Sequence, residues 1–453
     1  MKQWRTIGAW LWICVATLSW TQPSAATPLY AVNSANACDT CHVEPIGWAN
    51  PAAIADRRCT LDCQGCHISP TGGGQRTPLG QFYAAEVLAM HGTRPSSAAD
   101  LTSRLPAGAP NRGKYRLLDG FEGWWPGATP HREIADRYGD IDPEPVFAVG
   151  GDLRVMIVEP LEAQSQRESA VFPMEAQLYL SWYLSQSAVA YVDVGWQGSR
   201  TGLAPEGNPD ALTLLQDRLW LREVFFLFRD LPYATYVRVG RFALPYGWRI
   251  PDHTVYVRKD KFDVFRQAYG VEVGFSPNEY WANLALYWQG LHAWPGELDT
   301  TRRGPGITAQ GGIRYLGFTL GVSLHGMGIV SPGSHGIDES EFMAGPLWAL
   351  NLHPLVYLGE FDYRADRRAG GRVASLFQYH ELRWQGLRSF TPKLRYEWAD
   401  ANIAVLDDHL NRVAVGMEWN PLAQVQLDVL FRHEFRPVQG DLQDLLVQLH
   451  AHF

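Results

Sequence analysis

From about residue 144 to the end of the chain, apolar and polar side chains alternate with a period of two. In 176–184, for example, the first set is Ala176, Leu178, Leu180, Trp182 and Leu184, and the second is Gln177, Tyr179, Ser181 and Tyr183. The pattern recurs in 412–420, 424–435 and 445–453. Successive side chains of a β-strand point to opposite faces, so each segment predicts a strand with one apolar and one polar face.

Two features favour a transmembrane barrel over a soluble β-sandwich. The polar face carries charges in several strands, which suits a wet lumen, and tryptophans lie near predicted strand ends, which suits aromatic girdles. These tryptophans are Trp182, Trp288, Trp398 and Trp419. The terminal Phe453 resembles the sorting signal of bacterial outer-membrane barrels. The fold predicted for 144–453 is therefore mainly β, an antiparallel transmembrane β-barrel whose strands of about ten residues cross at a tilt.

The predicted barrel has about sixteen strands, with an uncertainty of about two. Short turns are predicted at 185–188, 229–233, 276–280, 315–318, 351–354, 386–389 and 420–423. Longer loops are predicted near 160–170, 197–216, 248–268, 292–304, 330–340, 365–373, 401–409 and 436–443. This alternation is typical of outer-membrane barrels, whose short turns face the periplasm. An even strand count puts both ends of the barrel on that side.

Residues 1–26 have the composition of a cleaved signal peptide. Lys2 and Arg5 precede an apolar stretch, and Ser24-Ala25-Ala26 supplies the small residues of a cleavage site after Ala26. An uncleaved anchor is the alternative, but the apolar stretch is short for a membrane helix. The sequence therefore predicts export, with the barrel in the bacterial outer membrane and its lipid.

The next segment, 27–143, contains the pattern Cys-x-x-Cys-His twice. The residues are Cys38, Cys41 and His42 in the first copy and Cys63, Cys66 and His67 in the second. Each copy has two thiols that can attach to the vinyl groups of a haem, followed by a histidine that can bind the iron. A zinc site does not usually have a histidine after each cysteine pair, and a thiol–disulfide pair needs none. The motifs therefore predict two covalent c-type haems in a small domain of mostly helical or irregular structure.

The sixth ligands of the two irons are less constrained. Candidates before the barrel are Met90, His91 and His131, and we expect His91 and His131. For His131, in a proline-rich stretch, the alternative is a solvated loop histidine. Cys59 also precedes Cys63 at a short spacing, but no histidine follows that pair, so we interpret Cys59 as a buried or free thiol.

The order of signal peptide, short haem segment and barrel resembles the fused cytochrome–porin proteins of the bacterial outer membrane, which include iron-oxidising outer-membrane cytochromes. The resemblance implies electron transfer across the membrane. It also implies extracellular Fe(II), or another redox partner, as the donor, and periplasmic carriers such as soluble cytochromes as partners. It makes an Fe(II)-oxidising activity a hypothesis. The chain departs from the iron-oxidising type, which resembles a single-haem fusion, in having two motifs.

A second class of function is a solute porin with an appended redox or sensing domain. A basic group of Arg241, Arg249, Arg258, Lys259 and Lys261 would suit an anion-selective constriction. Ordinary loop charge is the simpler interpretation, because acidic residues lie among these cations. A net charge of -8 and the lack of a basic block argue against nucleic acid as a partner.

Overall fold

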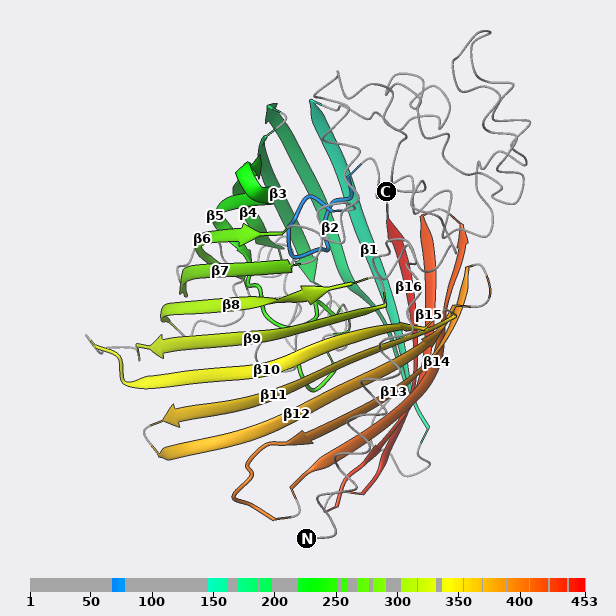
Figure 1. Cartoon of the computed structure of the whole chain (residues 1–453). Coiled ribbons are helices and arrows are strands. Elements are labelled where there is room, and N and C mark those ends of the chain that lie inside the picture. The colour runs from blue at the N-terminus through cyan, green and yellow to red at the C-terminus, as the bar shows by residue number, and fades with distance from the viewer. Residues whose placement is uncertain are drawn as a thin grey trace, which may run out of the picture.

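The structure is a computed structural model of the chain (Figure 1). It describes residues 67–77 and most of 146–452. Within the second range, it leaves out 162–168, 186, 198–218, 251, 253, 259–266, 277–279, 291–302, 316, 331–335, 353, 369, 386, 388, 407, 423 and 438–439. Among the described residues, no helix has both the length and the apolar character needed to span a membrane.

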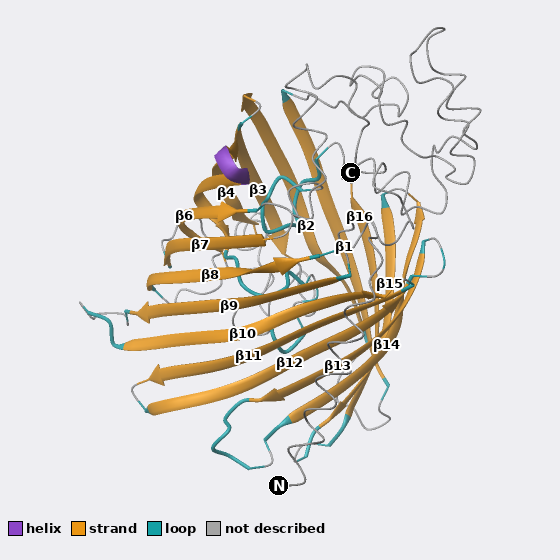
Figure 2. Cartoon of the chain, viewed as in Figure 1, coloured by secondary structure: helices purple, strands orange, loops and turns teal. Residues whose placement is uncertain are grey.

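Strands make up nearly all of the regular structure in the described part of the chain (Figure 2). They are β1 (Phe147–Pro160), β2 (Ala170–Ser185), β3 (Ala188–Gln197), β4 (Leu219–Leu231), β5 (Thr235–Ala243), β6 (Gln267–Phe275), β7 (Tyr280–Gln289), β8 (Gly304–Arg314), β9 (Phe318–Ile329), β10 (Glu339–Leu352), β11 (Leu355–Arg368), β12 (Gly371–Trp384), β13 (Phe390–Asp400), β14 (Leu410–Leu422), β15 (Val425–Phe435) and β16 (Leu442–His452). One turn of 3-10 helix, η6 (Pro232–Ala234), connects β4 to β5.

The strands pair in sequence order and form a closed barrel, because β1 also pairs antiparallel with β16. The predicted antiparallel barrel and its count of about sixteen strands are confirmed. The predicted short turns also agree with the observed connections to within a few residues. One predicted long loop is a short turn: within 365–373, β11 continues to Arg368 and β12 begins at Gly371. The charged residues there continue the strand pairing, with Arg367 opposite Arg372.

The barrel has an apolar exterior and a polar interior. On β2, Leu178 is 55% exposed and Trp182 is 51% exposed, whereas Tyr179 and Ser181 between them are buried. The same alternation of exposed and buried side chains holds on β14, where Val415 is exposed and Arg412 and Ala414 are buried. Exposed apolar bands around a closed barrel are suited to contact with lipid hydrocarbon. The alternation read from the sequence therefore corresponds to a lipid face and a lumen face.

The barrel's core lies in its lumen and contains both aromatic side chains and buried ion pairs. Aromatic side chains from β2 to β7 pack there around Ile68, and this cluster includes Tyr179, Tyr191 and Phe225. Buried pairs such as Arg238–Glu272 and Arg395–Glu381 lie on the same inner face. Charges that are removed from water are tolerated when they are paired and hydrogen-bonded. Part of the lumen is therefore filled by protein.

Candidate functional site

A short hairpin inside the barrel begins at His67, the last residue of the second cysteine motif (blue in Figure 1). His67 and Arg76 form an antiparallel bridge, and the backbone nitrogen of Ile68 donates to the carbonyl of Gln75 at 3.0 Å. Three consecutive glycines make the turn with positive φ values, and Gly74 has a φ of 63°. A Cβ on Gly74 would lie 2.5 Å from the Tyr191 hydroxyl, so glycine is required both by the turn and by the wall.

Strands β2, β3 and β5 hold the hairpin. The Gln75 backbone nitrogen donates to the Tyr191 hydroxyl at 3.3 Å, and Ser181 on β2 donates to the side-chain oxygen of Gln75. Arg238 on β5 donates from Nη1 to Ser69 Oγ at 3.0 Å. Three strands therefore fix the segment that follows the cysteine motif.

Arg238 is the most heavily used of these anchors. Its side chain is fully buried, and its Nη2 donates to Glu272 Oε2 at 2.5 Å and to the carbonyl of Ala243 at 3.2 Å. The guanidinium also lies 4.2 Å from the ring centroid of Phe242. Glu272 accepts a second hydrogen bond of 2.5 Å from the Tyr236 hydroxyl. Arg238 therefore links the hairpin to Glu272, the buried carboxylate of the wall with which it forms an ion pair.

A second segment, 244–258, leaves the wall between β5 and β6 and reaches strands on other parts of the barrel. The Tyr246 hydroxyl donates to Asp362 Oδ1 at 2.8 Å on β11, and the Tyr256 nitrogen donates to Glu397 Oε2 at 2.9 Å on β13. Arg412 on β14 donates to the carbonyl of Thr254 at 3.0 Å. The segment therefore crosses the lumen.

Arg249 joins the two inserted segments. Its Nη1 donates to Thr71 Oγ1 at 3.1 Å and to the carbonyl of Gly72, and its Nη2 contacts Glu223 Oε1 at 3.1 Å. The hairpin is therefore clamped between the barrel wall and the crossing segment.

Asp252 anchors the far end of the crossing segment through Arg395, whose Nη1 lies 2.7 Å from Asp252 Oδ2. Burial acts to raise the pKa of Asp252, but the guanidinium groups of Arg395 and Arg432 outweigh it and hold the pKa well below its usual range. Asp252 therefore stays ionised and attached to the wall over the ordinary pH range.

The basic group considered for an anion constriction is largely compensated. Arg249 pairs with Glu223, and Arg258 pairs with Glu360. The guanidinium of Arg241 lies 5.4 Å from the ring centroid of Tyr269. Lys259 and Lys261 lie outside the described residues. Two of the three described arginines therefore form ion pairs with carboxylates, and the third packs over an aromatic ring.

His67 is the predicted haem-binding residue that the structure describes, and its surroundings fit an iron ligand. Burial, helped by the nearby charges of Arg76 and Arg249, lowers the pKa of His67 to about 4, so the ring is neutral at ordinary pH. Its Nδ1 is shielded from solvent and makes no hydrogen bond within the described part of the chain, while the backbone of Gly74 lies near enough to the ring to stabilise its charged form. A neutral imidazole with an available nitrogen is the form that binds transition metals.

The other predicted haem residues lie outside the described residues. They are the attachment and iron-binding residues Cys38, Cys41, His42, Cys63 and Cys66, and the expected sixth ligands His91 and His131. Cys59 also lies outside them. The two haems and their sixth ligands stay predictions.

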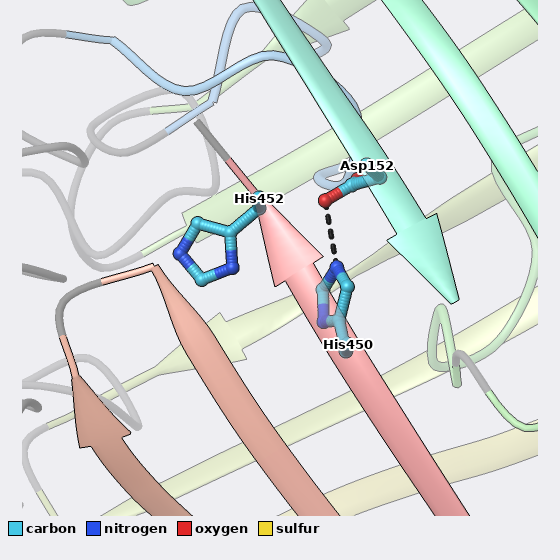
Figure 3. A group of neighbouring side chains, drawn as sticks. All are labelled: Asp152, His450 and His452. Carbon is cyan, nitrogen blue, oxygen red and sulfur yellow. Dashed lines mark hydrogen bonds and ion pairs between the residues drawn. The ribbon is translucent and has the colours of Figure 1, made fainter. Parts of the chain in front are cut away.

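A further cluster of metal-binding residue types was not singled out in the sequence. Asp152 on β1 lies beside His450 and His452 on β16, on the lumen side of the strands (Figure 3). The two histidines sit two residues apart on the predicted polar face of the last strand, which was the available signal. Asp152 is 298 residues away from His450 in sequence, and nothing local connects them.

Comparison with known proteins finds likeness at the level of fold. No family model and no curated protein sequence matches the chain. A loop L8 deletion mutant of OmpT, an outer membrane protein of Vibrio cholerae, is similar with 8% identity and a TM-score of 0.49, covering 68% of this chain and 99% of that one. The anion-selective porin from Comamonas acidovorans has 11% identity and a TM-score of 0.49, with coverages of 68% and 99%. The outer membrane channel DcaP of Acinetobacter baumannii has 8% identity and a TM-score of 0.47, with coverages of 68% and 97%.

The strand pairing itself establishes the closed antiparallel barrel.

Proposed function

We propose that this chain is an exported outer-membrane protein that carries two c-type haems, bound at Cys38–His42 and Cys63–His67, and passes electrons across the membrane. We include extracellular Fe(II) as the donor and a soluble periplasmic cytochrome as the acceptor, because the sequence layout resembles the iron-oxidising cytochrome–porin fusions. The bound haems supply one-electron chemistry at their iron.

One observation carries the proposal: the hairpin that directly follows the second motif lies inside the barrel. A solute channel with a haem domain suspended below it would not need Ser69, Gln75 and Thr71 to bind three different parts of the lumen. A bilayer's hydrocarbon is an insulator, so a redox group is useful for crossing it only if it is held within the span. The anchored hairpin supports such a position for the group that His67 would bind.

The residues around the hairpin also suit an electron-transfer site. Ile68 is buried among aromatic side chains of the wall, including Tyr191 and Phe225, whose ring centroids are 4.8 Å apart. A buried, rigid environment with fixed hydrogen bonds is one of the means by which proteins set a haem potential. Arg238, Arg249 and Tyr191 would keep the main chain at His67 in one place. The exposed apolar bands of the barrel support the membrane part of the proposal.

The test is electron flow into sealed liposomes that contain the full-length protein and a trapped acceptor. Fe(II) added outside should reduce the acceptor at a rate that depends on the protein. His67→Ala should abolish this reduction while leaving a folded barrel, judged by its heat-dependent migration in detergent gels. The matched control is His433→Ala, a lumen-remote histidine that pairs with Asp441 at 3.1 Å, and it should keep the wild-type rate. Wild-type rates in His67→Ala would contradict the proposal.

The second candidate is an anion or solute porin with an appended redox domain. The crossing segment 244–258 favours it, because a segment that narrows a lumen can select solutes as well as exclude them. Ion conductance in planar bilayers separates the two functions. We expect small currents, since the hairpin and the crossing segment occupy the lumen together. A large anion-selective current, with no acceptor reduction from any external donor, would establish the porin function instead.

A further inference from the structure

We propose that Asp152, His450 and His452 form a binding site for a divalent first-row transition-metal ion at the seam between β1 and β16 (Figure 3). The site does not depend on the proposed electron transfer, although Asp152 lies near enough to His67, the last residue of the second motif, for its charge to act on that ring. One ligand atom from each residue lies within 4.8 Å of the others. Two imidazoles and one carboxylate suit ions such as Fe(II) and Zn(II).

The register of the strands brings these residues together. Asp152 lies directly opposite His452, and His450 lies opposite Arg154, so all four side chains are on the lumen face. Arg154 does not neutralise the carboxylate of Asp152 by direct pairing, because its Nη1 is directed to Glu175 Oε2 at 3.3 Å. Asp152 and His450 are both more than nine-tenths buried. The seam therefore has a shielded carboxylate beside two imidazoles.

Neighbouring side chains orient the ligands. On β15, Gln426 Nε2 donates to Glu418 Oε2 at 3.4 Å, which turns its Oε1 toward His450 Nδ1 at 3.3 Å. His450 Nδ1 then carries the hydrogen and donates, and His450 Nε2 faces Asp152 Oδ1 at 2.6 Å. The other oxygen of Asp152 accepts from the Tyr179 hydroxyl on β2. Hydrogen bonds that fix the tautomer of a histidine and the orientation of a carboxylate are typical of the groups behind metal ligands.

If His450 Nδ1 donates to Gln426, a proton or a metal ion must lie between Asp152 Oδ1 and His450 Nε2, because both atoms are then acceptors at close range. A proton would satisfy these two atoms alone. A metal ion would also use His452, whose ring centroid is 5.2 Å from that of His450. The ion would then cross-link the first and last strands of the barrel.

The experiment uses the full-length, haem-containing protein in detergent with Zn(II) as the probe, so that haem iron does not enter the count. After chelation and dialysis, Zn(II) is added and the bound metal is measured by mass spectrometry. Wild type should retain about one more equivalent than Asp152→Asn or His452→Ala, as expected for a site that loses a ligand. The matched control is His433→Ala, because His433 and Asp441 form a histidine–carboxylate pair with no second histidine, and its zinc content should equal that of wild type.

A second measurement keeps the inference testable if a variant folds poorly. Zn(II) should raise the temperature at which the folded wild-type band converts to the unfolded band in detergent gels, and it should not do so in His452→Ala. Equal zinc content in wild type, Asp152→Asn and His452→Ala would overturn the inference and leave an ordinary protonated His450–Asp152 pair. A thermal shift of the same size in wild type and His452→Ala would also overturn it.

Discussion

Replacing Arg238 by Met should be among the most costly single changes in the lumen. Arg238 Nη2 lies 2.5 Å from Glu272 Oε2, and both side chains are completely buried. The change leaves Glu272 as a buried charge without its cation, and it removes the hydrogen bond from Arg238 to Ser69 on the hairpin. Losing one partner of a buried pair costs about 3–5 kcal/mol. Since Tyr236 still donates to Glu272, we expect a loss at the lower end, about 3 kcal/mol.

Urea unfolding in detergent micelles, followed by tryptophan fluorescence, measures this loss. The double variant Arg238→Met with Glu272→Gln removes the buried charge while keeping an acceptor for Tyr236, so it should recover to within about 1 kcal/mol of wild type. The control is Arg368→Ala, which breaks a 2.9 Å pair with Asp366 whose arginine side chain is 52% exposed and should cost under about 1 kcal/mol.

The comparison between the two arginine variants decides whether the lumen is dry around the hairpin. If Arg238→Met costs no more than Arg368→Ala, water must screen Glu272 and the hairpin is not packed against the wall as described. If the double variant is as unstable as the single one, the loss comes from packing and not from the unpaired charge.

Three further outcomes follow from the same structure. Gly74→Ala should destabilise the docked hairpin by about 1–3 kcal/mol, because its φ is 63° and a Cβ would meet Tyr191, whereas Gly336→Ala, with open space at its Cβ, should be neutral in the same urea titration. Asp252 has a depressed pKa, so its stabilising contribution is full above the unfolded-state value of about 4 and is lost as the pH falls below it. Unfolding at stepped pH should therefore show a shallower acid loss in Asp252→Asn, and an unchanged acid limb would refute that attribution. An epitope inserted at 404–406, between β13 and β14, should be labelled on intact cells, whereas one inserted at 423–424, between β14 and β15, should be labelled only after the outer membrane is opened. The reverse labelling would invert the topology.

Local pattern was sufficient to predict the barrel wall. Leu178 and Trp182 alternate with Tyr179 and Ser181 between the two faces of β2. This alternation is set by the strand's own backbone and does not depend on which strands pair with it. The connection predicted at 365–373 is shorter than expected, because β11 and β12 extend their pairing through that charged stretch to Arg368 and Gly371.

The lumen contents could not be predicted in the same way. Ser69 and Arg238 are 169 residues apart, and Arg249 and Gly72 are 177 apart, so no window of sequence contains both partners. The motif ending at His67 predicted a chemistry from its spacing, but the location of the hairpin that begins at His67 depends on these distant contacts. Asp152 and His450 illustrate the same limit at the seam, since they meet only when the last strand pairs with the first.

The position of the hairpin constrains the order in which the protein can be made. Residues 67–77 precede β1 in the chain, yet their partners Ser181, Tyr191 and Arg238 line the inside of a ring that closes when β16 joins β1. A bulky group attached beside His67 would be hard to thread into a lumen already crossed by residues 244–258. If a group is attached beside His67, its attachment should therefore come before ring closure. Assembly in the membrane would then close the barrel around a hairpin that already carries its attached group.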